Sequence, residues 1–161
     1  MELLQQARSL YHAGEMHDAL EAAQAACERK PKDAEGWWLL GCISRYTAMP
    51  AASDDAFRRA AGLSRRRSLP VRLDPAAFSV LVDQAVAELS TDARRRLEKT
   101  SIRIGQLLPL EAVRAGASPD LPASRERRPV DVLTLFQINL ENRCGDEAEL
   151  ARLVGRTLAR A

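Results

Sequence analysis

The sequence predicts a mostly α-helical protein with a small α+β second part. Apolar residues recur at helical spacing through most of the chain, the first part repeats after about 34 residues, and short β-branched stretches occur only in the second part. With 161 residues, the chain is long enough to bury a core in one domain or in two small ones. Its 46% hydrophobic and 29% charged residues are typical of a folded globular protein.

The first part of the chain is an internal repeat. The stretches "LLQQARSLYHAGEMHDALEAAQAACERKPKD" and "WWLLGCISRYTAMPAASDDAFRRAAGLSRRR" align at an offset of about 34 residues. The small residues Ala7 and Gly41 align and would let paired helices approach closely, whereas Trp37 and Phe57 would fill the space between neighbours. Pro31 closes the first copy because proline cannot continue a helix. Each copy is expected to be a helix, a short turn and a second helix.

The stretch "WWLLGCISRY" carries a Trp-x-x-Leu-Gly pattern through Trp37, Leu40 and Gly41. With this pattern, residues 1–67 resemble two tetratricopeptide repeats, and Ser44 is a mild departure because a large residue is usual there. The resemblance implies a protein-binding surface on the first helix of each pair.

The binding surface of such repeats is concave, and its candidate residues follow from repeat position. Arginine beside aromatic rings would suit an acidic or carboxylate-bearing peptide. The alternative is that the aromatic residues pack within the stack. The candidates are Arg8, Tyr11 and His12 in the first repeat, and Trp38, Arg45 and Tyr46 in the second.

Two repeats are fewer than the three or so usually needed for a stable stack. We therefore expect a helix over residues 75–89 to pack on the second repeat. Phe78 and Leu81 would then be buried beside Phe57 and Leu63.

Residues 68–74 form a linker, and the pattern changes after it. A helix begins at Pro75, capped by Asp74, and a second short helix is expected near 91–98. The rest of this part is predicted as a strand in "SIRIGQLLP", a proline-rich loop over 115–129, a strand in "VDVLTLF", and a terminal helix in "DEAELARLVGRTLARA" with a capping box and an apolar stripe.

The order helix–helix–strand–loop–strand–helix over residues 75–161 resembles the small zincin-like metallopeptidase family of bacteria. The resemblance lies in "FSVLVDQAVAEL", "IRIGQLLP" and "DVLTLFQINLENRCGDEAELARLVGRTL". In that family the last helix carries His-Glu-x-x-His, which holds zinc and polarises a water molecule. The motif is expected directly after Leu158, where this chain has Ala159 and Arg160. The resemblance therefore implies a degenerate remnant with no metal site, cofactor or catalytic residue.

Few residues elsewhere offer other chemistry. The two histidines, His12 and His17, are separated by a glycine-bearing turn and would not share one helix face. The cysteines Cys27, Cys42 and Cys144 lack metal-binding spacing, and we interpret them as buried, reduced thiols of a cytoplasmic protein.

The net charge of +2 is too small to suggest nucleic acid, and the arginine clusters near 65–67, 94–96 and 125–128 have no interleaved aromatic residues. We interpret these clusters as solvated helix ends and loops, with a phosphate-binding role as the alternative. No apolar run is long enough for a transmembrane helix, and the N-terminus does not resemble a secretory signal.

The sequence thus predicts a non-catalytic cytoplasmic adaptor that binds another protein or peptide, for which an acidic one is a candidate. It predicts no cofactor, no nucleic acid and no membrane partner. One alternative is a truncated zinc metallopeptidase whose catalytic helix continues beyond residue 161. Another open point is a homodimer through the C-terminal helix or a sheet edge.

Overall fold

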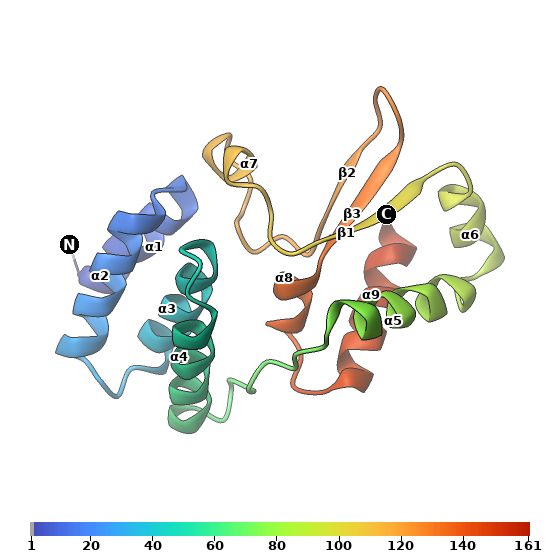
Figure 1. Ribbon diagram of the computed structural model, residues 1–161. Coiled ribbons are helices and arrows are strands. Elements are labelled where there is room, and N and C mark those ends of the chain that lie inside the picture. Colours follow the sequence, from blue (N-terminus) through green and yellow to red (C-terminus); the bar gives the residue numbers. More distant parts are fainter. Residues whose placement is uncertain (1) are drawn as a thin grey trace. The chain divides into compact units, whose positions relative to one another are not determined.

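The computed structural model describes residues 2–161, and the chain divides into two compact units. The first unit runs to Leu69 and includes Pro109–Pro119, and the second comprises Pro70–Leu108 and Asp120–Ala161. The predicted fold class is confirmed, because the fold is mostly helical with a small three-stranded sheet and a C-terminal helix (Figure 1).

The first unit contains two helical hairpins. Small residues tighten the second hairpin, since a Cβ added at Gly41 would lie 2.8 Å from two ring carbons of the buried Phe57. The Ser53 hydroxyl, also buried, donates to the Gly41 carbonyl at 2.7 Å. The helices are α1 (Leu3–Ala13), α2 (Met16–Arg29), α3 (Ala34–Tyr46) and α4 (Pro50–Leu63), each packed against the next.

Trp37 does not fill the interior as the sequence suggested. Its side chain is only partly buried, its indole N–H donates to the Pro31 carbonyl at 2.9 Å, and the Arg59 guanidinium lies 4.4 Å from its ring centroid. The ring therefore anchors the turn between α2 and α3.

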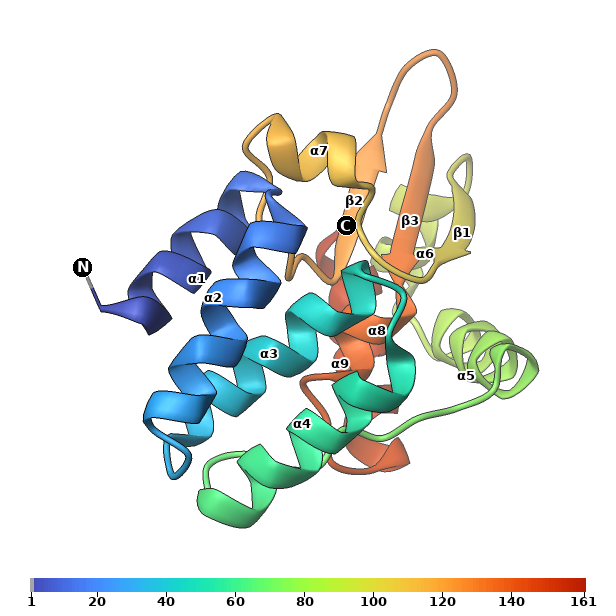
Figure 2. The same ribbon diagram turned by 60° about the vertical axis from the view of Figure 1, so that its left-hand side comes forward.

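A segment from far along the chain completes the first unit. Pro109–Pro119 contains the short helix α7 (Leu110–Arg114), which packs against α1 (Figure 2). The Tyr46 hydroxyl donates to the Pro119 carbonyl at 3.1 Å, and Val113 is fully buried. The sequence placed these residues in the second part, because no local pattern shows which helices they contact.

The second unit is a three-stranded sheet with helices packed against it. In the strand order β1-β3-β2, β1 is parallel to β3 and β2 is antiparallel to β3. Its elements are α5 (Pro75–Ala87), α6 (Thr91–Leu97), β1 (Ser101–Gly105), β2 (Ala123–Glu126), β3 (Val132–Phe136), α8 (Gln137–Glu141) and α9 (Glu147–Arg160).

The strand β2 corrects the sequence analysis, which assigned residues 115–129 to a loop. Its sequence, Ala-Ser-Arg-Glu, has neither β-branched residues nor apolar alternation. The strand forms because its backbone pairs with β3, with Ser124 opposite Thr134. Pairing across this hairpin leaves little trace in a short polar stretch.

The helix α5 also differs from expectation. Phe78 and Leu81 are buried in the core of the second unit together with Leu135 and Leu150, and α5 packs along α9. The prediction that they would lie beside Phe57 and Leu63 is therefore wrong, and Leu63 is 42% exposed. The large aliphatic side chains of β3 and α9 provide the apolar partners that the α5 stripe requires.

The terminal helix α9 follows the sequence closely. The Asp146 carboxylate accepts from the Glu149 backbone N–H at 2.8 Å, and the Glu149 carboxylate accepts from the Gly145 N–H at 2.8 Å. Leu150, Val154 and Leu158 are buried as one stripe. Within residues 2–161, every helix is too short or too polar to cross a membrane.

Candidate functional site

Of the six residues predicted on the concave face of the repeats, some are exposed and others pack inside the first unit. Arg8 and His12 are exposed on α1. Tyr11 is only 2% exposed, and its ring lies 6.1 Å from that of Tyr46, whose hydroxyl is bound to Pro119. Both tyrosines therefore pack within the first unit, which is the alternative that the sequence analysis left open.

Arg45 also has a role inside its hairpin. Its side chain is 14% exposed, its Nε donates to the Ser53 hydroxyl at 3.1 Å, and its Nη2 pairs with the Asp54 carboxylate at 2.5 Å. These contacts tie α3 to α4. We therefore expect replacement of Arg45 to disturb the hairpin itself.

Trp38 lies at the centre of a cluster that the sequence analysis recognised only in part. Its ring packs edge-on against Phe57, with centroids 4.7 Å apart, and the Arg67 guanidinium lies 4.4 Å from the ring centroid. Arg67 also forms a two-pronged ion pair with Glu35, with distances of 3.0 and 2.7 Å. The two residues are 32 positions apart in the sequence, so the sequence analysis could not predict their ion pair.

The charges of this region act together. The hydrogen bonds from Arg67 lower the pKa of the Glu35 carboxyl, partial burial opposes that shift, and the positive charge of Arg8 adds to the lowering. Arg8 therefore lies within electrostatic reach of Glu35. We call Arg8, Glu35, Trp38 and Arg67 the repeat-face cluster, which combines two guanidinium groups with one carboxylate.

The second unit contains a buried polar network around Glu141, whose side chain is 1% exposed. One carboxylate oxygen accepts from the Leu73 N–H at 3.1 Å and from Gln137 Nε2 at 2.8 Å, and the other accepts from Arg72 Nη1 at 3.2 Å. Gln106 donates to the Gln137 carbonyl oxygen at 3.4 Å. Through Arg72 and Leu73, this network attaches the end of the linker to α8. Within residues 2–161, every buried side-chain nitrogen or oxygen has a hydrogen-bond partner.

The three cysteines are buried, and no disulfide joins them. Burial is the main cause that raises the pKa of the Cys27 thiol to about 11, with a smaller contribution from the Asp33 charge. Burial likewise raises the pKa of Cys144. Both thiols are therefore protonated at neutral pH and are poor nucleophiles.

At the end of α9, the Ala159 carbonyl accepts from Arg96 Nη2 at 2.7 Å, and the Arg160 side chain is exposed. These are the positions at which the zincin-like resemblance places the first metal ligand and the general base. In the part of the chain that the structure describes, no group of three or more histidine, cysteine, aspartate or glutamate side chains is arranged to hold a metal ion. His12 and His17 are both exposed, on α1 and α2.

No protein-family model matches the chain, and no curated protein matches it significantly.

Proposed function

We propose that this protein is a non-catalytic adaptor whose first unit binds another protein or peptide through the repeat-face cluster. The observation that carries the proposal is the Arg67 guanidinium, which lies over the Trp38 ring and pairs with Glu35, within electrostatic reach of the exposed Arg8. A stacked guanidinium is oriented in advance, which lowers the entropy cost of binding a carboxylate.

Charge defines the partner class. The cluster carries two guanidinium groups against the single carboxylate of Glu35, so its formal charge favours an acidic ligand. Arg8 forms no hydrogen bond or ion pair with other residues of the range 2–161, and a ligand carboxylate would be its partner. The resemblance of residues 1–67 to tetratricopeptide repeats supports a peptide as the ligand. The three cysteines are buried and no disulfide joins them, which supports a cytoplasmic location.

The proposal is tested with fluorescent acidic peptides and matched peptides in which glutamine replaces glutamate. Arg67→Gln should weaken acidic-peptide binding about tenfold, and Arg8→Gln by roughly two- to fivefold, because Arg8 is exposed to solvent. Arg29→Gln provides the control, since Arg29 is exposed on the opposite helix of the first hairpin. Equal binding of the two peptide sets would contradict the proposal.

The non-catalytic part of the proposal has its own test. Ala159 and Arg160 stand where the zincin-like resemblance requires a histidine and a glutamate. We expect elemental analysis of the purified protein to find no stoichiometric zinc, and peptide substrates to remain intact. One tightly held zinc ion per chain would favour the metallopeptidase alternative.

A further inference from the structure

A pocket of about 460 Å³ opens in the second unit, where α9 meets β2 and β3. Figure 1 shows the C-terminal end of α9 beside the sheet. Five of the lining side chains are arginines, and none is acidic or aromatic. The lining residues used below are Leu121, Leu133, Leu153, Arg125, Arg127, Arg143, Arg156 and Arg160.

Two of the five arginines are held in place by the protein. Arg125 pairs with Asp131 through Nε and Nη2, at 2.9 and 2.6 Å, and its Nη1 donates to the Ala161 carbonyl. Arg143 Nη2 donates to the Asp120 carbonyl at 2.8 Å. These contacts fix two positive charges at the pocket wall.

The other three arginines have no such partner. Arg127, Arg156 and Arg160 are exposed, and among residues 2–161 none of them forms a hydrogen bond or ion pair. Arg156 and Arg160 are four residues apart on α9, a spacing at which like charges face each other and repel. The partial negative charge at the C-terminus of α9 stabilises Arg156 and Arg160. It does not account for Arg127, which follows β2, or for the fact that all three arginines line the same pocket.

The remaining lining is aliphatic, and Leu121, Leu133 and Leu153 contribute to it. The pocket volume falls within the range of roughly 300–1,000 Å³ that is usual for small-molecule sites. Guanidinium groups match the geometry of phosphate oxygens, and several together favour a dianion over a single carboxylate.

We propose that this pocket binds a phosphate monoester that carries an aliphatic body. The guanidinium groups of Arg127, Arg156 and Arg160 hold the phosphate, and the leucines contact the carbon chain. No aromatic side chain lines the pocket, so its apolar contacts come from aliphatic groups.

Calorimetric titration of the intact protein with hexyl phosphate, hexanoate, hexanol and inorganic phosphate tests the assignment. Hexyl phosphate should bind at least about tenfold more tightly than hexanoate. Its affinity should fall as the pH drops below about 6, where the phosphate monoester takes up its second proton. Inorganic phosphate should bind more weakly because it lacks the aliphatic body, and hexanol should show no binding.

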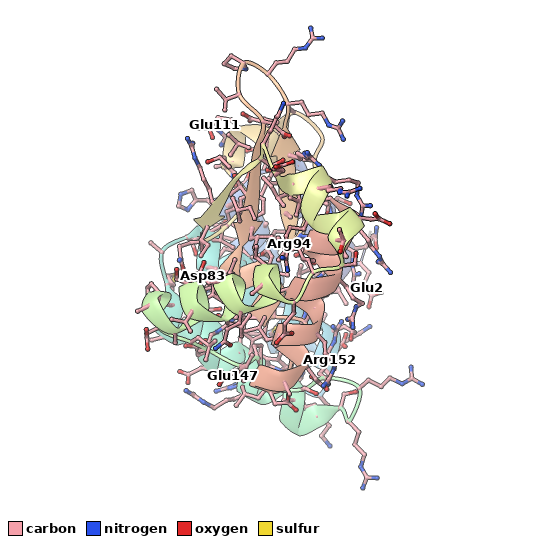
Figure 3. All side chains as sticks on the ribbon, turned by 90° about the vertical axis from the view of Figure 1, so that its right-hand side faces the viewer. Glu2, Asp83, Arg94, Glu111, Glu147 and Arg152 are labelled. Atoms are coloured by element: carbon pink, nitrogen blue, oxygen red, sulfur yellow. The ribbon has the colours of Figure 1, made fainter. Side chains whose placement is uncertain are left out.

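Variants locate the site. Arg156→Gln and Arg160→Gln should each weaken hexyl phosphate binding about tenfold. Arg152→Gln, one turn earlier on α9 and outside the pocket, should leave binding unchanged (Figure 3). All three side chains are exposed, so the substitutions preserve the fold. Equal loss in Arg152→Gln and Arg156→Gln would overturn the assignment.

A phosphate monoester could also be presented by a lipid. Phosphatidylcholine vesicles with and without phosphatidic acid distinguish the two sources. If the protein binds phosphatidic acid vesicles and hexyl phosphate releases it from them, the pocket is supported and a lipid headgroup is its ligand. Binding to phosphatidic acid vesicles without any binding of hexyl phosphate would overturn the pocket and assign the arginines to a membrane surface.

Discussion

The two units differ in how they use their arginine clusters. In the first unit, Arg67 of the cluster at 65–67 is anchored by Glu35 and stacks on Trp38. In the second, Arg125 of the cluster at 125–128 is anchored by Asp131, whereas Arg127 lines the pocket and forms no hydrogen bond or ion pair with residues 2–161. A carboxylate outside the cluster thus holds one arginine of each cluster in place, 32 residues away for Arg67 and six for Arg125. In the first unit the held arginine itself belongs to the proposed peptide site, whereas in the second unit the proposed ligand contacts exposed arginines that the protein does not hold.

The units also differ in how their interiors are built. The first relies on small residues that let helices approach, as at Gly41, whereas the second buries large aliphatic side chains and the polar network around Glu141. The following substitutions test that difference.

The largest effect is expected in the buried network. Glu141→Ala would remove the acceptor for Arg72, Gln137 and the Leu73 N–H, and should destabilise the protein by about 3–5 kcal/mol. The control Glu147→Ala changes an exposed carboxylate in the first turn of α9 (Figure 3) and should cost under about 1 kcal/mol. Urea unfolding, with hydrogen exchange of α9 amides to locate the change, measures both.

An intermediate effect is expected from glycine replacements in the two units. Gly41→Ala places a methyl group against the Phe57 ring and should cost about 1–3 kcal/mol. Gly155→Ala on α9 meets no atom within 4 Å and should stabilise the protein by about 0.5–1 kcal/mol through helix propensity. Thermal unfolding of both variants measures these changes in stability. If both substitutions stabilised the protein, or both destabilised it, the two units would not differ in packing as described.

The smallest effect concerns the Arg125–Asp131 pair. The hydrogen bonds from Arg125 are the main cause that lowers the pKa of Asp131 from 3.8 to about 2, and the Thr100 hydroxyl contributes. Because the folded-state pKa is depressed, the stabilisation is fully present above about pH 4 and is lost as the pH falls towards 2. The difference in urea midpoint between wild type and Asp131→Asn should be constant near neutral pH and shrink over that range. If the difference in urea midpoint were the same at pH 2 as at neutral pH, the charge of Asp131 would contribute nothing to stability.

Local features could be predicted from the sequence. The alignment of Ala7 with Gly41, the helical hairpins and the capping box at Asp146 all arise from residues a few positions apart or from the repeat offset. The buried stripe of α9 follows from helical periodicity in the same way.

Features that depend on contacts without a local sequence pattern could not be predicted. The strand β2 exists through pairing with β3, the Arg67–Glu35 pair spans 32 residues, and α7 joins the first unit from beyond the linker. Tyr11 and Arg45 occupy the expected repeat positions, but their contacts make them part of the packing. The resemblance to tetratricopeptide repeats and to zincin-like peptidases stays a prediction.

The central claim is that the two units bind different ligands through different arginines. The most direct test titrates wild type, Arg67→Gln and Arg156→Gln with both an acidic peptide and hexyl phosphate. We expect Arg67→Gln to weaken only peptide binding and Arg156→Gln to weaken only hexyl phosphate binding, each about tenfold. Loss of both ligands in one variant and of neither in the other would contradict it.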